Sequence, residues 1–354
     1  MRDAQSRFLD YMSGARRGPW ASVVRGALSA LAAPYRMGCA LRTALYDWGL
    51  LISRELEAIV ISVGNLTAGG TGKTPMVIWL GRWLRQRSIP TAILSRGYGP
   101  KGLGGSDSDE ALLFRRHLPK VPHLVGADRY ASGRKAIADH GAECILLDDG
   151  FQHLRLARDL DIVLIDALEP WGHGHVLPRG LLREPPGALR RADVIVLTRC
   201  DLCEKEDLRA IQRRIREVCG YRPVVESAHQ PVRFYRHGTE ESRSLEWVRD
   251  RPVYAFSALG NPRAFPATLG ALGAEVVEHR SFRDHHWYDE ADLDALAAAA
   301  RHAEAQAIVT TEKDAVKIRA FPTDSPPLFV LAVELTLGEG EDQLVEVLEQ
   351  VLAG

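Results

Sequence analysis

The chain has few cysteines, almost no excess of charge of one sign and no long uninterrupted apolar run. Five cysteines at irregular spacing do not make the disulfide framework of a small secreted domain. Cys200-x-x-Cys203 lacks a second pair at the spacing of a familiar zinc module. A formal net charge of −1 argues against a broadly basic surface, so we expect no nucleic-acid partner. The 354 residues suffice for two globular domains in a reducing compartment.

Residues 1–55 differ from the rest of the sequence. No uncharged apolar run there reaches the roughly 18–20 residues that a spanning helix needs, and Pro34 also breaks the pattern. Arginines interleaved with Leu, Tyr and Trp are typical of a helix that lies in a membrane interface. A helix packed on the core of the protein would have a similar composition. We weigh the two interpretations equally.

The most specific motif is a glycine-rich turn that ends in Gly-Lys-Thr. It follows the β-branched run 58–63 and precedes a helical pattern from Pro75, which is the layout of a phosphate-binding loop. Glycines let backbone N–H groups crowd around phosphate oxygens. We expect Lys73 to reach the β- and γ-phosphates and Thr74 to hold Mg²⁺. The loop comprises Thr67, which replaces the usual first glycine, Ala68, Gly69, Gly70, Thr71, Gly72, Lys73 and Thr74.

Short apolar runs alternate with helical patterns, which predicts a parallel sheet covered by helices. We expect an α/β fold, with a P-loop NTPase-like sheet in residues 56–226, a connection over 227–250 and a smaller α/β domain in 251–354. The closing helix 341–352 could pack back on the first domain. The strands predicted in the first domain are 58–63, 91–95, 123–125, 143–147, 161–165, 194–198 and 223–226, and the helices are 75–87, 109–117, 129–140 and 205–218.

Several polar residues could carry chemistry. Asp148 and Asp149 close an apolar strand, where a carboxylate beside a phosphate loop supports Mg²⁺, although Asp-Asp-Gly is also common in turns. Asp109 begins a helix, so it is either a general base or an ordinary first-turn acid. His285 could tune a carboxylate. Arg183 could clamp a phosphate or belong to a solvated loop, and Glu184 follows it.

The ordered motifs resemble those of the tetraacyldisaccharide 4'-kinase family, the lipid A 4'-kinases of Gram-negative bacteria. The resemblance runs from about residue 30 to about residue 335 and is carried by five segments. They are Ser62-Val-Gly-Asn-Leu-Thr-Ala-Gly-Gly-Thr-Gly-Lys-Thr-Pro75, Ser95-Arg-Gly-Tyr-Gly99, Asp148-Asp-Gly-Phe-Gln-His153, Leu177-Pro-Arg-Gly-Leu-Leu-Arg-Glu-Pro185 and Thr310-Thr-Glu-Lys-Asp-Ala-Val-Lys317, with Asp284-His285 between the last two.

The resemblance implies transfer of the γ-phosphate of ATP to the 4'-hydroxyl of a lipid A disaccharide 1-phosphate precursor, with Mg²⁺. It implies that Asp109 is the base, that His285 is its partner and that Asp148 and Asp149 are the acidic pair of the active site. Asp109 stands in Ser-Asp-Glu-Ala where the family has Gly-Asp-Glu-Pro, so Asp107 remains an alternative base. The residues expected near the substrate are Arg183, Glu184 and Asn65, and those expected at the metal are Thr74 and Asp149.

The family's N-terminal helix associates with the inner membrane, so we expect a peripheral or monotopic protein on its cytoplasmic face, with no obligatory protein partner. Two alternatives stay open. Thr198-Arg-Cys-Asp201 is faintly similar to a guanine-reading segment, which would suggest a GTPase-like switch or a metal-delivery chaperone. A non-enzymatic membrane adaptor is the other. The role of 310–317 is left open, as structural or near the nucleotide.

Overall fold

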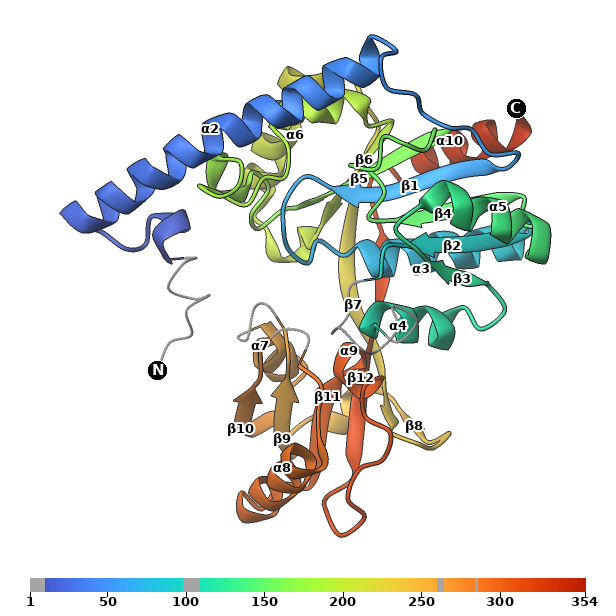
Figure 1. The fold of residues 1–354 in the computed structure, drawn as a ribbon. Helices are drawn as coiled ribbons and strands as arrows, with labels where there is room; N and C mark the ends of the chain where they lie inside the picture. Colours follow the sequence, from blue (N-terminus) through green and yellow to red (C-terminus); the bar gives the residue numbers. More distant parts are fainter. Residues whose placement is uncertain (1–9, 98–107, 260–263, 284–285) are drawn as a thin grey trace. The chain divides into compact units, whose positions relative to one another are not determined.

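The computed structural model describes residues 10–97, 108–259, 264–283 and 286–354, which form two compact units (Figure 1). Unit 1 holds residues 1–97, 121–228 and 337–354, and unit 2 holds residues 98–120 and 229–336. Residues 98–120 thus group with unit 2, although they lie between two strands of unit 1 in the sequence. The closing helix α10 (Glu341–Ala353) groups with unit 1.

The sheet of unit 1 is parallel at every registered pair, and its strand order is β7-β6-β5-β1-β4-β2-β3. From β1 the chain continues to β2 on one side, whereas the neighbouring β5 continues to β6 on the other. Ligands of open α/β sheets bind at such a switch point, beyond the carboxyl ends of the strands. The strands are β1 (Ile59–Asn65), β2 (Thr91–Ser95), β3 (His123–Val125), β4 (Cys144–Asp148), β5 (Leu160–Asp166), β6 (Val194–Thr198) and β7 (Val224–Arg236).

Helices cover both faces of this sheet. Right-handed crossovers place α3 (Lys73–Gln86) on one face and both α5 (Arg129–His140) and α6 (Lys205–Cys219) on the other. Helix α10 joins the α3 side, where Glu349 pairs with Arg87 at the end of α3 (3.0 Å). The strands and helices agree with the predicted α/β class, and the edge that carries the phosphate loop lies between the two helical layers.

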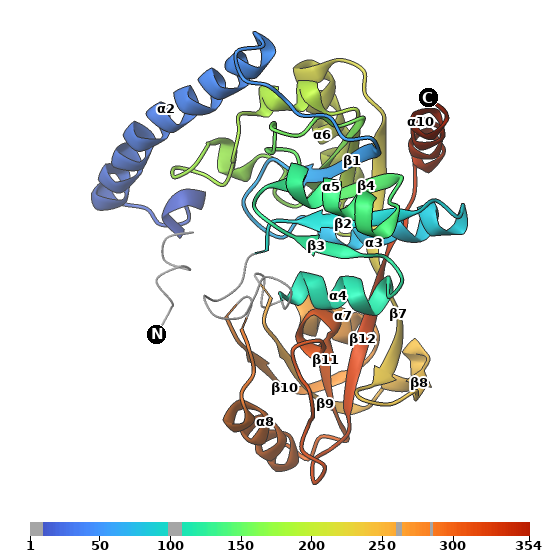
Figure 2. The same cartoon turned by 45° about the vertical axis from the view of Figure 1, so that its right-hand side comes forward.

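Helix α2 (Pro19–Asp47) lies along the same side of unit 1 as α6 (Figure 1 and Figure 2). Ala32 packs into the core cluster that contains Leu208 and Ile211 of α6. Pro34 was expected to interrupt this segment, yet the helix continues through it. Contacts to unit 1 offset the lost backbone hydrogen bond, since the Tyr35 hydroxyl donates to the Arg183 carbonyl (2.9 Å). No helix in the described part of the chain is long and apolar enough to cross a membrane.

Unit 2 contains a second sheet, with the strand order β10-β9-β11-β12-β7 and β8 antiparallel to β7. Alternate residues of β9 face opposite helices. Val253 and Ala255 pack in the cluster of α7 (Ala264–Ala271), and Tyr254 and Phe256 pack in that of α8 (Glu290–His302). The other elements are β8 (Ser242–Arg243), β9 (Pro252–Ser257), β10 (Glu275–Ser281), β11 (Ala307–Thr311), β12 (Leu328–Leu337), α4 (Asp109–His117) and α9 (Glu312–Ala315).

The segment 227–250, predicted as the connection between the domains, begins within β7, which continues from unit 1 to Arg236. Polar residues and Pro231 concealed the strand, since proline removes a donor from a sheet ladder. Phe234 and Tyr235 are nevertheless buried, and Phe234 packs with Val248 in the core of unit 2.

Candidate active site

The phosphate loop 67–74 connects β1 to α3 and is held in place by its own neighbours. The buried Asn65 side chain donates to Thr71 Oγ1 (2.8 Å) and accepts from Lys73 Nζ (3.4 Å). The Ala68 N–H donates to the carbonyl of Leu181 (2.7 Å). Gly72 has φ 86°, a conformation that favours glycine, immediately before the first turn of α3. The loop is therefore preformed, and the structure gives Asn65 a role in shaping it in addition to the predicted substrate contact.

Asp149 holds two cations beside this loop. Arg183 Nη1 lies 2.8 Å from both carboxylate oxygens of Asp149, and Lys73 Nζ lies 3.5 Å from Oδ1. Burial alone would raise the pKa of Asp149, but the charges and hydrogen bonds of Lys73 and Arg183 bring it below its ordinary value. The residue has φ 56°, which Asp tolerates better than most side chains. Asp149 is thus ionised at neutral pH.

Asp148 is the last residue of β4 and is buried in register with Val63 of β1. Asp148 therefore lies at the same edge of the sheet as the end of β1, which the phosphate loop follows. Among the described residues no group of three or more His, Cys, Asp or Glu could hold a metal, and this part of the chain includes Cys200 and Cys203. Thr74 and Asp149 nevertheless offer the hard oxygen donors that Mg²⁺ prefers, and a nucleotide would supply phosphate oxygens. These two residues therefore fit a nucleotide-dependent magnesium ion.

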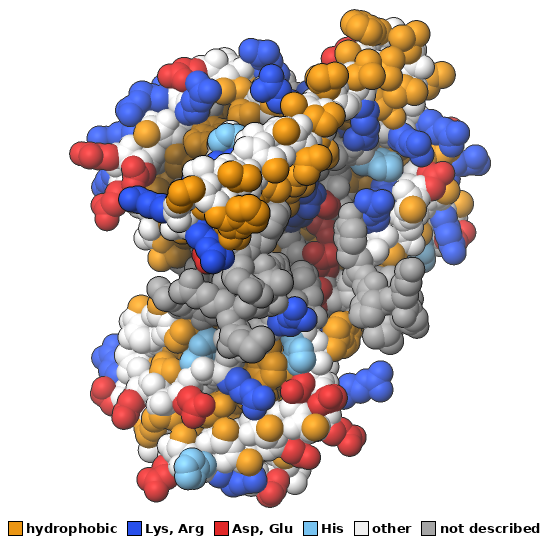
Figure 3. Space-filling view, turned by 60° about the vertical axis from the view of Figure 1, so that its left-hand side comes forward, with side chains coloured by type: hydrophobic (Ala, Val, Ile, Leu, Met, Phe, Trp, Pro, Cys, Tyr) orange, Lys and Arg blue, Asp and Glu red, His pale blue; other side chains and the backbone are white. Residues whose placement is uncertain are grey.

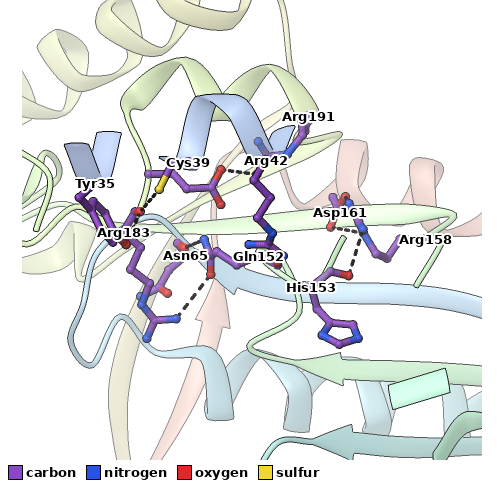
Figure 4. A network of polar contacts seen from close by, with 11 residues as sticks. Tyr35, Cys39, Arg42, Asn65, Gln152, His153, Arg158, Asp161, Arg183 and Arg191 are labelled. Atoms are coloured by element: carbon purple, nitrogen blue, oxygen red, sulfur yellow. Dashed lines mark hydrogen bonds and ion pairs between the residues drawn. The ribbon is translucent and has the colours of Figure 1, made fainter. Parts of the chain in front are cut away.

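The two other residues expected near the substrate occupy different surroundings, and Figure 4 shows Arg183 and Arg191, which belong to them. Arg183 faces Asp149, whereas Glu184 is 7% exposed and accepts from Arg191 Nη2 (2.8 Å). The Arg191 guanidinium in turn lies over the ring of Phe151, 4.6 Å from its centroid. In this arrangement Glu184 fixes the loop on which Arg183 is carried. Its direct contact with substrate remains an expectation.

Two residues that bind the backbone of the phosphate loop or of the residue at the end of β1 were not among the predicted site residues. Arg199 pairs with Asp166 (2.9 Å) and also donates to the Gly70 carbonyl of the phosphate loop. Gln152 Nε2 donates to the Asn65 carbonyl (2.9 Å). Arg199 directly follows the buried strand β6, so its place at the carboxyl edge of the sheet was the available signal. Gln152 gave no signal beyond its place in the Asp148–His153 motif.

Asp109 belongs to unit 2, where it is the first residue of α4 and is 6% exposed. Ser108 caps this helix by accepting from the Ala111 N–H (3.2 Å). Lys313 Nζ of α9 lies 3.7 Å from Asp109 Oδ2. His285 and Asp107, the expected partner and the alternative base, lie outside the described residues.

Comparison with known proteins decides the family. The family model described as Tetraacyldisaccharide-1-P 4'-kinase matches residues 24–353. The chain belongs to this 4'-kinase family. A tetraacyldisaccharide 4'-kinase of Anaeromyxobacter sp. (strain Fw109-5) is 42% identical over 354 residues, covering 96% of this chain and 95% of that protein. One of Syntrophus aciditrophicus (strain SB) is 42% identical over 328 residues, covering 85% and 86%.

A solved structure gives the same result. The "apo" form of LpxK from Aquifex aeolicus, in complex with ATP, superimposes with a TM-score of 0.72 at 30% sequence identity, covering 93% of this chain and 99% of that one. These findings confirm the predicted fold class and the resemblance: the chain is a kinase that acts on a hydroxyl acceptor. They do not favour the GTPase-like switch or the metal-delivery chaperone.

The 310–317 segment of this 4'-kinase-family chain is built around a buried carboxylate. Asp314 is fully buried and accepts from the Tyr288 hydroxyl (3.0 Å), the Thr311 hydroxyl (2.6 Å) and the Ala258 N–H (3.1 Å). Lys317 Nζ lies 3.2 Å from Asp314 Oδ1. The network joins α9 to β9 and to the segment before α8, and it fixes the helix that carries Lys313.

The lowered pKa of Asp149 predicts a stability difference that depends on pH. A folded pKa below the ordinary value contributes stability above about pH 4, and this contribution is lost as the pH falls through the folded pKa. We expect Asp149→Asn to melt below the parent protein at pH 7, and the gap to narrow below about pH 4. Asn tolerates the left-handed backbone at this position, so the comparison isolates the charge. Calorimetry of both proteins at pH 7 and below about pH 4 measures the difference in melting temperature. A difference that does not change with pH would contradict the ion pairs of Asp149 with Lys73 and Arg183.

Proposed function

We propose that this chain transfers the γ-phosphate of ATP to the 4'-hydroxyl of a tetraacyldisaccharide 1-phosphate in lipid A biosynthesis. The observation that carries the proposal is the preformed phosphate loop with Lys73 and Arg183 gathered on Asp149. Two cations beside the loop can offset the charge of a phosphoryl group in transfer. The similar LpxK structure is in complex with ATP, which supports ATP as the donor.

Each residue then has a defined task in this proposal. The backbone of 67–74 binds the phosphates, and Thr74 with Asp149 holds Mg²⁺, which neutralises phosphate charge when bound. Release of Lys73 and Arg183 from Asp149 frees both cations for the phosphoryl oxygens. Asp109, which lies beside Lys313, accepts the proton of the sugar hydroxyl, with His285 as its proposed partner. Arg199 keeps the loop in shape through the Gly70 carbonyl.

Transfer of label tests the function directly. The full chain is incubated with γ-labelled ATP, Mg²⁺ and tetraacyldisaccharide 1-phosphate in neutral detergent micelles. We expect label in the lipid product, with no transfer to the same lipid methylated at the 4'-oxygen. Label that appears only as inorganic phosphate would mean that the chain is an ATPase without this acceptor.

We further propose that α2 and residues 48–52 rest on a membrane surface, on the cytoplasmic face where ATP is available. Exposed apolar side chains recur three to four residues apart, or at multiples of that spacing, along one face of α2: Trp20 (70% exposed), Val23, Leu31 and Leu41. Hydrophobic side chains gather along the helix in Figure 3. The opposite side carries Ala21, Ala32 and Cys39, which are buried or half-buried against unit 1.

Removing this apolar face should weaken membrane binding. The triple variant Trp20→Ser/Leu31→Ser/Leu41→Ser loses three large exposed side chains, each contributing about 1.5–3 kcal/mol when transferred out of water. We expect vesicle partitioning, measured by co-sedimentation, to fall by at least ~100-fold. The control is Trp20→Leu/Leu31→Met/Leu41→Met, which keeps the face apolar. Equal partitioning of the Ser variant and this apolar variant would place the membrane contact elsewhere.

A further inference from the structure

A cavity of about 230 Å³ lies in unit 1 between the segment after α2, the start of α5 and the loop from β4 to β5. Its lining is basic and aromatic at the walls, with Arg54, Tyr130, His153 and Arg155, and apolar at Leu51 and Ile52. No residue expected to bind the nucleotide, metal or sugar hydroxyl lines it. The cavity is therefore separate from the phosphate loop.

The two arginines are placed side by side by the backbone. The Arg54 N–H donates to the Arg155 carbonyl (2.9 Å), and the Ala157 N–H donates to the Arg54 carbonyl (2.9 Å). The Arg54 guanidinium also lies over the ring of Tyr130, 5.0 Å from its centroid, which restricts its orientation. In the described part of the chain, neither guanidinium has a carboxylate within ion-pair distance, whereas Arg158, Arg183, Arg191 and Arg199 of unit 1 each have one. The pair is thus available to an anion.

The charge balance around His153 also favours an anion. Burial lowers the pKa of His153 to about 4, and the charges of four arginines add to this shift: Arg129, Arg155, Arg158 and Arg42. Figure 4 shows the labelled His153, Arg42 and Arg158 of this surrounding. At neutral pH the imidazole is uncharged and can donate one N–H. Asp128 is the acid of the lining, and it is engaged at the start of α5, where it accepts from the Ala131 N–H (3.1 Å).

The apolar part of the lining indicates what kind of molecule carries the anion. Leu51 and Ile52 line the cavity and are 40% and 80% exposed, and they continue the exposed run from Trp48 and Leu50. Exposed leucine and isoleucine side chains do not strengthen the binding of a small polar anion. They do strengthen the binding of an amphiphile, because its phosphate contacts the two arginines while its acyl chains contact the apolar side chains.

One loop links this cavity to the phosphate site. Asp149 pairs with Lys73, and His153 lines the cavity four residues later, a separation that an extended chain spans in at most ~14 Å. That is the scale of two linked sugar rings. We propose that Arg54, Arg155 and His153 bind the 1-phosphate at the far end of the acylated disaccharide, which rests on the function proposed above. The cavity then selects the substrate that already carries its first phosphate.

Two lipid acceptors test the inference, the tetraacyldisaccharide 1-phosphate and the same lipid with a free 1-hydroxyl. Both are assayed in neutral detergent micelles without phospholipid. We expect Arg54→Gln and Arg155→Gln each to lower kcat/KM for the phosphorylated lipid by roughly 10–100-fold, because a hydrogen bond to a charged group is lost. For the 1-hydroxyl lipid the loss should stay within about threefold, which also shows that the variants fold. Arg134→Gln is the matched control, since Arg134 is exposed on α5 and does not line the cavity.

The outcomes separate the two proposals. A parent enzyme that labels neither lipid refutes the proposed function, whatever the arginines do. An active parent whose Gln variants lose activity equally on both lipids refutes the phosphate site. A second arm measures co-sedimentation with vesicles that contain or lack an anionic phospholipid. If the Gln variants lose only vesicle binding and keep their selectivity in micelles, the cavity takes a phospholipid headgroup and the inference is wrong.

Discussion

Lys73→Ala should abolish nearly all phosphoryl transfer, with kcat/KM lower by at least ~10³-fold, because a preorganised cation at the transferring group is lost. The lysine is held 3.5 Å from Asp149 and 3.4 Å from Asn65 before any nucleotide arrives. Little reorganisation is then needed when the phosphates bind. The measurement is steady-state transfer of label to the lipid at saturating ATP and Mg²⁺.

Two control variants show whether the loss of activity in Lys73→Ala comes from the missing charge or from a folding defect. Lys135→Ala removes an exposed lysine of α5 and should leave transfer unchanged. Lys73→Arg keeps the charge but not the compact ammonium, so we expect it to recover only part of the activity. Transfer by Lys73→Ala within tenfold of the parent would remove the phosphate loop from the mechanism.

Most of the fold follows from local sequence signals. The strands 91–95, 123–125 and 194–198 and the helices 109–117 and 129–140 have their predicted bounds in the structure. The strands 91–95 and 194–198 are short β-branched or apolar runs that end at a polar residue, and 123–125 ends before Gly126. Two of these helices begin at a capping residue, Ser108 or Asp128, whose side chain accepts from a backbone N–H. Such signals lie within a few residues of the element that they define.

The errors lie where tertiary packing overrides local preference. β7 passes through Pro231 because Phe234 and Tyr235 are buried on the far side of it, and a sequence window cannot show that burial. Helix α2 passes through Pro34 because its flanks are tied to unit 1, through Tyr35 to the Arg183 carbonyl and through Arg42 to the Gln152 carbonyl. Those partners are more than 100 residues away in the sequence.

The candidate site divides in the same way. Residues 67–74 and the pair Asp148–Asp149 were recognisable because their chemistry needs a fixed local order. The pairing of Asp149 with Arg183, 34 residues away, depends on how the loop after β5 returns to the sheet. The sequence therefore predicted only that Arg183 could clamp a phosphate, and not that it pairs with Asp149. Lys313 drew no attention from sequence. Its place near Asp109 depends on the buried Asp314 network that holds α9.

Asp109→Asn should lower kcat by roughly 10²–10⁴-fold with a much smaller change in KM, because the proton acceptor is lost while the shape of the side chain is kept. Asp109 is 6% exposed, and its Oδ2 lies 3.7 Å from Lys313 Nζ, so the carboxylate is shielded from solvent and beside a cation. An ordinary acid in a first helical turn would instead affect the stability of α4 and leave turnover intact.

Three companion variants make this result decisive. Asp107→Asn separates the alternative base, since only the true acceptor should carry the large kcat loss. Lys313→Met removes the ammonium that lies 3.7 Å from Asp109 Oδ2 but keeps the carboxylate, so a loss of kcat in this variant measures what the ion pair contributes. Lys313→Arg keeps the charge and should restore the parental kcat. If Asp109→Asn lowers the melting temperature but leaves kcat unchanged, Asp109 is an ordinary first-turn acid of α4 and the proton must leave by another route.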